Sequence, residues 1–89
     1  ILDLGCGTGI ATKIIATKLD YQSLFALDLA DNLLQIARNK LPLAGSFILG
    51  DYDNLPINKN CINLCLANMS LHWSKNLTKT LSCLYSSLV

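Results

Sequence analysis

Three glycines near the start of the chain have a spacing that could form a ligand-binding turn. Gly5, Gly7 and Gly9 alternate in the opening run ILDLGCGTG. Glycine lets a ligand approach main-chain N–H groups closely, and at the start of a helix these groups favour negative charge. The pattern predicts a turn that binds a nucleotide-like cofactor, with a tight turn that binds nothing as the alternative. A dinucleotide fingerprint would need a third glycine where Ile10 stands, which disfavours NAD.

Asp28 follows these glycines at a distance that suits a ribose. It lies nineteen residues after Gly9, at the end of an apolar run. A carboxylate in that place can accept hydrogen bonds from both ribose hydroxyls. The alternative role for Asp28 is to cap the following helix, for which Asp31 is better placed.

Asp51 and Asn68 follow two further apolar runs. Asp51 could accept a hydrogen bond from an adenine amino group, with Tyr52 beside it as an apolar face. The alternative is an Asx-turn in the run GDYDN. Both residues are therefore candidates for the same ligand as Asp28.

These candidates need elements that bring them to one edge of a sheet. Hydrophobic periodicity predicts strands at 1–4, 23–29, 46–49 and 61–67, and helices at about 10–19, 31–40 and 75–88. Strands that alternate with helices predict an α/β fold with a Rossmann-like parallel sheet, and right-handed crossovers give the strand order 3-2-1-4. Such sheets bind ligands beyond the carboxyl ends of their strands, where the candidate residues fall.

The predicted helices are expected to bury apolar stripes. On the first helix the expected face includes Ala11, Ile14 and Ile15. On the second it is Leu33, Leu34, Ala37 and Leu41, closed by Pro42. On the last it is Leu77, Leu81, Leu84, Tyr85 and Leu88.

Composition narrows the possible partners. The 89 residues are 52% hydrophobic with a mean hydropathy of +0.41, which argues against disorder and for one domain at most. A net charge of +1 gives no strong field for nucleic acid or an anionic membrane, and no apolar run approaches the roughly 20 residues that cross a bilayer. We expect no nucleic-acid partner, no membrane contact and a cytoplasmic location.

The four cysteines do not predict a metal centre. Cys6, Cys61, Cys65 and Cys83 form no CxxC pair, and His72 is the single histidine. On the predicted fourth strand, Cys61 and Cys65 would lie roughly 13 Å apart at about 3.3 Å per residue. We expect no bound metal and cysteines that act as small buried hydrophobes in a reducing compartment.

The arrangement resembles the class I S-adenosylmethionine-dependent methyltransferases over essentially all 89 residues. ILDLGCGTG is similar to their first motif and ALDLA to the acidic motif of their second strand. GDYDNLP is similar to their adenine-side motif, and LCLANMSLHW to their fourth-strand motif. The resemblance implies a partial class I methyltransferase fold and S-adenosyl-L-methionine as cofactor.

The resemblance also implies a set of cofactor-binding residues. They are Asp3, Gly5, Cys6, Gly7, Gly9, Asp28, Leu29, Asp51, Tyr52 and Asn68. Asp3 and the glycine loop would hold the methionine portion of the cofactor. Asp28 would hold the ribose hydroxyls, Asp51 and Tyr52 would hold the adenine, and Asn68 would lie near the transferable methyl group.

Within this class, the run from Asp53 to Leu88 is most similar to the malonyl-[acyl-carrier-protein] O-methyltransferases of biotin synthesis. That similarity implies methylation of a carboxyl group, on a small molecule or on a carrier protein. Such a group is already ionised at pH 7, so no base is required. His72 is the sole candidate for a catalytic base and is better interpreted as a wall or hydrogen-bonding residue of the acceptor pocket. Trp73 either lines the same pocket or packs the final helix onto the sheet.

Two departures from the family leave other hypotheses open. Ile62-Asn63 stands where the family usually has an aromatic residue and an aspartate, and Ala30 where it often has a capping serine. The alternatives are a methyltransferase-like assembly factor without enzyme activity and a fragment of an NAD-dependent dehydrogenase.

Both ends of the chain fall inside predicted elements, a strand at Ile1 and a helix at Val89. We expect residues 1–89 to be the cofactor-binding portion of a methyltransferase domain, truncated at both ends. On its own, this portion is expected to bind cofactor poorly and to transfer no methyl group at a useful rate.

Overall fold

The computed structural model describes residues 1–40, 46–68 and 70–89. Its elements are β1 (Leu2–Leu4), α1 (Ile10–Lys18), β2 (Phe25–Asp28), α2 (Asp31–Lys40), β3 (Ser46–Leu49), β4 (Cys65–Ala67), the 3-10 helix η1 (Leu71–Trp73) and α3 (Leu77–Ser87). The predicted alternation of strands and helices is confirmed.

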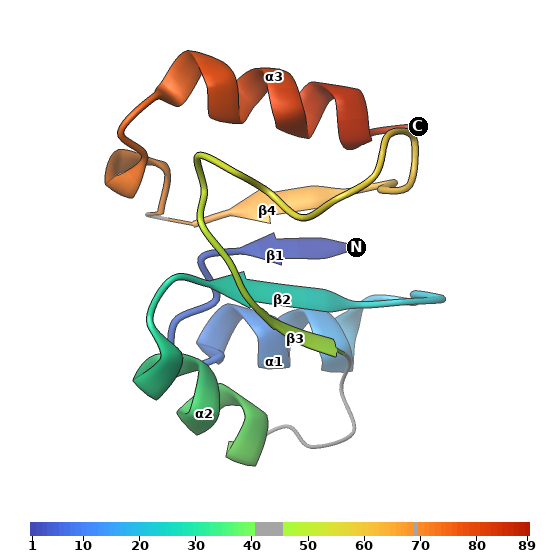
Figure 1. The fold of residues 1–89 in the computed structure, drawn as a ribbon. Helices are drawn as coiled ribbons and strands as arrows, with labels where there is room; N and C mark the ends of the chain where they lie inside the picture. Colours follow the sequence, from blue (N-terminus) through green and yellow to red (C-terminus); the bar gives the residue numbers. More distant parts are fainter. Residues whose placement is uncertain (41–45, 69) are drawn as a thin grey trace.

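The four strands form one parallel sheet in the order β3-β2-β1-β4 (Figure 1). Leu4 of β1 is in register with Leu27 of β2 on one side and with Ala67 of β4 on the other. The predicted order 3-2-1-4 is therefore confirmed. The chain leaves β1 toward β2 and returns to β1's other side at β4, so the carboxyl end of β1 is the point where the connections diverge.

Alternate residues of the strands pack against helices on opposite faces of the sheet. Leu2, Leu4 and Leu27 join a buried cluster with Leu84 of α3. Ala26, the neighbour of Leu27, instead joins Leu34 and Ala37 of α2. Figure 1 shows α3 on the opposite side of the sheet from α1 and α2. Both faces carry helices, as a parallel sheet requires.

The fourth strand is shorter than predicted. The prediction of a strand at 61–67 is wrong for its first half, because β4 begins only at Cys65. The N–H groups of Cys61 and Ile62 instead donate to the carbonyl of Ser87, each at 2.8 Å. The segment thus satisfies the last carbonyls of α3, and Cys61 and Cys65 do not share a strand.

Helix α3 does not bury the stripe that its apolar residues predict. Leu84 is buried and Leu88 packs against the core, but Leu77 and Leu81 are exposed and Tyr85 is 82% exposed. The buried face is Thr80, Leu84 and Ser87. The hydroxyls of Thr80 and Ser87 both donate to main-chain carbonyls, so these polar residues can be buried at little cost.

Helix α2 follows its pattern more closely, whereas α1 buries only part of the expected face. In α2, Leu34 and Ala37 are buried as predicted, while Leu41 and Pro42 lie outside the described residues. In α1, Ile15 is buried and Ile14 is exposed, because Thr12 takes the inward position beside β1. None of the helices in the described ranges is long and apolar enough to cross a membrane.

The four cysteines are free thiols in different surroundings. Cys6 is buried, as predicted, and Cys65 and Cys83 are half-buried. Cys61 is exposed, so the expectation of a buried cysteine is wrong there. Its place outside the strand accounts for the difference.

Candidate functional site

The glycine turn between β1 and α1 adopts a backbone that other residues resist. Gly5, Gly7 and Gly9 all have positive φ angles, of 76°, 55° and 91°. A Cβ at Gly5 would lie 2.3 Å from the Cβ of Ser70 and 2.9 Å from the hydroxyl oxygen of Tyr52. A Cβ at Gly7 would meet nothing within 4 Å. The turn is therefore closely packed at Gly5 and open at Gly7, where a ligand can approach the main chain.

A cavity of about 400 Å³ opens beside this turn. The residues that line it end or follow the four strands: Gly5, Gly7, Asp28, Leu29, Ala30, Leu33, Tyr52 and Ser70. A larger hollow of about 620 Å³, lined by Ile1 and Asp20 among others, lies at the opposite end of the strands. Because parallel sheets bind ligands at the carboxyl ends of their strands, the smaller cavity is the candidate site.

Asp28 is the charged group of this cavity. Its side chain is 7% exposed, and each carboxylate oxygen accepts one main-chain hydrogen bond. Oδ2 accepts from the N–H of Gly7 and Oδ1 from the N–H of Ala30, both at 2.8 Å. A carboxylate has about four acceptor positions, so two remain for a ligand's hydroxyl groups.

Asp31 does not cap α2, so that interpretation is wrong. It is the first residue of the helix, and its Oδ2 accepts from Nε2 of Gln35 at 3.1 Å. Asp28 instead satisfies the N–H of Ala30, just before the helix. Asp28 therefore stabilises the start of α2 and also lines the cavity.

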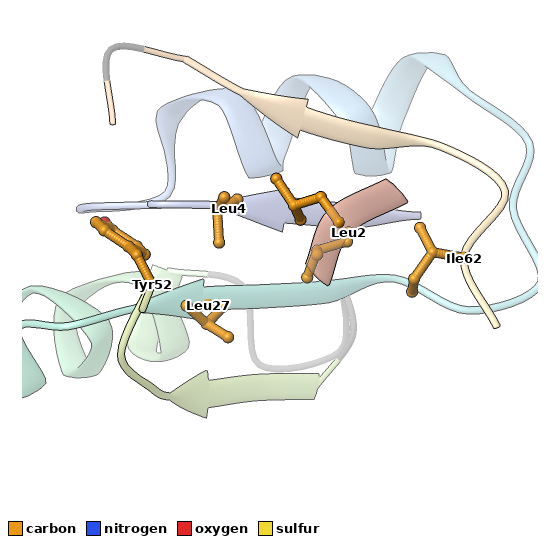
Figure 2. Close-up of a cluster of buried hydrophobic side chains, with 6 residues drawn as sticks. Leu2, Leu4, Leu27, Tyr52 and Ile62 are labelled. Carbon is orange, nitrogen blue, oxygen red and sulfur yellow. The ribbon is translucent and has the colours of Figure 1, made fainter. Parts of the chain in front are cut away.

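Tyr52 forms an apolar wall of the cavity. It is 4% exposed and packs with Leu4 and Leu27, at one end of the buried cluster shown in Figure 2. Burial, assisted by the charge of Asp28, raises the pKa of the Tyr52 phenol to about 12. The hydroxyl beside Gly5 is therefore neutral at physiological pH.

A model of the methyltransferase domain family matches residues 1–89, the whole of the chain. The chain belongs to this family. S-adenosyl-L-methionine is accordingly the expected cofactor. The turn open at Gly7, the spare acceptor positions of Asp28 and the wall of Tyr52 fit the nucleoside portion of that molecule.

Several bacterial methyltransferases are similar to this chain. The malonyl-[acyl-carrier protein] O-methyltransferase 2 of Coxiella burnetii is 38% identical over 99% of this chain and 36% of its own length. The malonyl-[acyl-carrier protein] O-methyltransferase of Pectobacterium atrosepticum is 33% identical over 96% of the chain and 32% of its own length. The chain thus spans about a third of these relatives.

The fold is also that of solved methyltransferase structures. An S-adenosylmethionine-dependent methyltransferase from Mesorhizobium loti superimposes with a TM-score of 0.89 at 23% identity. The match covers 98% of this chain and 40% of that one. At this identity the likeness establishes the shared fold.

Asp3 and Cys6, which were predicted to bind the cofactor, do not line the cavity. Asp3 is 1% exposed, and its Oδ2 accepts from Oγ1 of Thr12 at 2.6 Å. Burial raises the pKa of the Asp3 carboxyl. Cys6 packs against Leu34 and Ala37, and burial raises the pKa of its thiol to about 12. Neither group is placed to touch a ligand in the cavity directly.

Of four other predicted residues, one lines the cavity and three do not. Leu29 lines it, whereas Asp51, Asn68 and His72 are exposed and do not. Oδ1 of Asp51 accepts from the N–H of Asp53 at 3.0 Å, the Asx-turn that was the alternative for this residue. Trp73 ends η1, and its side chain lies outside the described parts of the structure.

Sequence reasoning missed Ser70. Its side chain is buried, lines the cavity, and donates from Oγ to the carbonyl of Leu4 at 2.9 Å. A serine in a loop carries no signal of its own. The pairing of β4 with β1 brings Ser70 onto Gly5, sixty-five residues away in the sequence. Its position could be predicted only from the strand order together with the path of the chain after β4.

The described residues contain no group of three or more histidine, cysteine, aspartate or glutamate side chains that could hold a metal ion.

Proposed function

We propose that this chain binds S-adenosyl-L-methionine in the cavity beside the glycine turn, as part of an O-methyltransferase that acts on a carboxyl group. The observation that carries the proposal is Asp28. Its buried carboxylate borders an open cavity of about 400 Å³ and is fixed in place by the N–H groups of Gly7 and Ala30. Because the carboxylate is fixed in this way, it needs little reorganisation to accept hydrogen bonds from the hydroxyl groups of a ribose.

The residues of the chain would bind and orient the cofactor. Asp28 accepts hydrogen bonds from the ribose hydroxyls, and Tyr52 offers its ring to the adenine. Main-chain groups of residues 5–9 approach the methionine portion, with Asp3 supporting the loop from below through Thr12. Asp51, Leu29 and Asn68 would contact the cofactor from the rim. When bound, the cofactor supplies a methyl group on a positively charged sulfur, and positioning of reactants can contribute roughly 7–11 kcal/mol.

The groups that line the cavity favour the proposal that the methyl acceptor is already ionised. Among the described lining residues, Asp28 is held by two hydrogen bonds and the Tyr52 phenol has its pKa raised to about 12. The hydroxyl of Ser70 donates a hydrogen bond to the main-chain carbonyl of Leu4. These groups are poorly suited to remove a proton from an acceptor, and a carboxylate has none to lose at pH 7.

The names of the relatives support a malonyl group on an acyl carrier protein as acceptor, and biotin synthesis as the pathway. A small carboxylic acid is the alternative. His72 and Trp73, in η1 after β4, would contribute to the acceptor side of the site. The four free thiols favour the proposal that the protein functions in a reducing compartment such as the cytoplasm.

We also propose that residues 1–89 are the cofactor-binding portion of a larger methyltransferase domain. The chain spans 36% and 32% of its two relatives. Among the described residues β4 pairs only with β1, and the nearby Leu64 and Leu66 are exposed. An extended version is expected to melt more cooperatively, with a larger shift on adding S-adenosylhomocysteine, than residues 1–89 alone. Equal melts would contradict this proposal.

A transfer assay tests the proposed reaction. The complete protein that carries this chain would be incubated with radiolabelled S-adenosylmethionine and malonyl-loaded, acetyl-loaded or unloaded carrier protein. We expect label only on the malonyl-loaded carrier, released by mild base as expected for a methyl ester. His72→Gln should retain most of this activity, because no base is required. Binding of the cofactor without transfer to any carboxyl group would favour the assembly-factor alternative.

A further inference from the structure

Asp53 lies one residue after Tyr52 but makes its contacts far along the chain. Its Oδ1 accepts from Oγ of Ser74 at 2.5 Å and from the N–H of Asn76 at 3.1 Å. Its Oδ2 accepts from the N–H of Lys75 at 2.9 Å. One carboxylate in the loop after β3 thus binds the three residues that immediately precede α3.

Thr80 extends this cluster to the main chain of Tyr52. Its side chain is fully buried in the first turns of α3. Oγ1 donates to the carbonyl of Tyr52 at 2.9 Å and lies 3.2 Å from Oδ1 of Asp53 and 2.9 Å from Oγ of Ser74. Tyr52 is therefore fixed to α3 through its carbonyl group, while its ring lines the cavity.

The segment of residues 70–76, which precedes α3, is held at both ends. At its start, Ser70 donates to the carbonyl of Leu4, and its Cβ approaches Gly5 so closely that only glycine fits there. At its end, the residues before α3 bind Asp53. Tyr52 lies between the two attachments, with its hydroxyl close to Gly5 and its carbonyl on Thr80.

We propose that Asp53 is a positioning residue, which fixes the segment of residues 70–76 to the loop of Tyr52 and so holds the Tyr52 and Ser70 wall of the cavity against the glycine turn. The inference rests on the proposed function in one respect, that this cavity binds S-adenosylmethionine. The same hydrogen bonds, the Ser74 hydroxyl first, lower the pKa of Asp53 to about 2, so the carboxylate is fully ionised at pH 7.

The simpler alternative is that Asp53 only stabilises the start of α3. Asn76 already caps this helix, because its Oδ1 accepts from the N–H of Lys79 at 3.2 Å. A carboxylate at a helix N-terminus is favourable in any case. A purely local role predicts that loss of Asp53 affects residues near the helix start and leaves the cavity unchanged.

Three substitutions separate these roles in the complete protein. Asp53→Asn keeps the size of the side chain but replaces one acceptor oxygen by a donor, opposite N–H groups that need an acceptor. Thr80→Val removes the hydroxyl that binds Tyr52, whereas Thr80→Ser retains it. The matched control is Asp20→Asn, an exposed acid at the other end of the strands.

The first measurement is hydrogen–deuterium exchange of the ligand-free protein, at a temperature where every variant has the far-UV circular dichroism of the wild type. Asp53→Asn and Thr80→Val are expected to exchange faster in peptides that cover residues 5–9 and 50–55 as well as 70–76. Thr80→Ser and Asp20→Asn should match the wild type. Faster exchange confined to residues 74–78 would overturn the proposal and leave Asp53 as a helix cap.

The second measurement is the dissociation constant of S-adenosylhomocysteine. Asp53→Asn and Thr80→Val are expected to raise it on the order of tenfold, because the wall of Tyr52 and Ser70 is no longer fixed, while Thr80→Ser and Asp20→Asn stay within about twofold. Unchanged affinity in Asp53→Asn would overturn the positioning role. A wild type that binds no S-adenosylhomocysteine would contradict the proposed function, and the exchange pattern would still decide whether Asp53 fixes the wall.

Discussion

Gly5 and Gly7 have similar backbone conformations but different surroundings. Both have positive φ angles, yet Gly5 is in contact with Ser70 and Tyr52, and Gly7 faces open space. The alternating glycines were enough to predict the turn from the sequence. Which glycine is packed and which is open depends on the return of the chain after β4, and no local pattern contains that information.

Gly5→Ala is expected to destabilise the fold much more than Gly7→Ala. An alanine at either position must adopt a left-handed backbone, which costs about 1–2 kcal/mol of unfolding free energy. At Gly5 the new methyl group would also displace Ser70, at a further cost of about 1–3 kcal/mol. Urea unfolding of the two variants measures the difference in the free energy of unfolding. Equal losses would show that the contact between Gly5 and Ser70 does not constrain the loop.

Asp51 and Asp53 show how far residue-level reasoning reaches in the run GDYDN. The sequence singled out Asp51, because it follows an apolar run, and gave no reason to select Asp53. In the structure Asp51 forms an exposed Asx-turn, while Asp53 binds residues 21 to 23 positions away. Contacts at that separation depend on tertiary packing, so neither spacing nor residue type could predict them.

The contribution of Asp53 to stability is expected to disappear in acid. Its pKa is lowered from 3.8 to about 2 in the folded chain, so the unfolded chain binds more protons between these values. Stability from this group is therefore fully present above pH 4 and is lost as the pH falls toward 2. The difference in unfolding free energy between wild type and Asp53→Asn should shrink over that range. A difference that stays constant or grows on acidification would contradict the assignment.

At the scale of elements, the sequence predicted the existence of each helix better than the face it buries. Apolar periodicity located α1, α2 and α3 to within a few residues. In α3, however, Thr80 and Ser87 face inward because their hydroxyls find carbonyl partners, and Leu81 and Tyr85 remain exposed. Hydrophobicity patterns treat a serine or threonine as polar, so they cannot anticipate a buried hydroxyl that is fully hydrogen-bonded.

A pair of leucines on α3 tests this assignment of faces. Leu84 is 8% exposed and contacts the core cluster, whereas Leu81, three residues earlier, is 47% exposed. Leu84→Ala is expected to cost about 2–5 kcal/mol of unfolding free energy, and Leu81→Ala less than about 1 kcal/mol. Chemical denaturation of both variants provides the comparison. The stripe expected from the sequence, in which both leucines are buried, would instead give similar losses.

At the scale of the whole molecule, the order β3-β2-β1-β4 followed from general rules of chain topology. Right-handed crossovers in a parallel sheet leave few arrangements for four strands, and the structure has the expected one. The same rules placed Asp28 and the glycine turn at one edge of the sheet. The width of the cavity and its wall of Tyr52 and Ser70 depend on side-chain packing between the loops after β3 and β4, which those rules do not describe.

The most direct test of the central claim is a calorimetric titration of S-adenosylhomocysteine and of NAD into the complete protein and into two aspartate variants. We expect S-adenosylhomocysteine to bind and NAD not to bind. Asp28→Ala should weaken binding tenfold or more, since hydrogen bonds to a charged acceptor contribute roughly 1.5–3 kcal/mol. Asp31→Ala, which removes only the exposed contact with Gln35, should leave the affinity unchanged. Preferential binding of NAD, or equal effects of the two substitutions on affinity, would contradict the assignment of the cavity to S-adenosylmethionine.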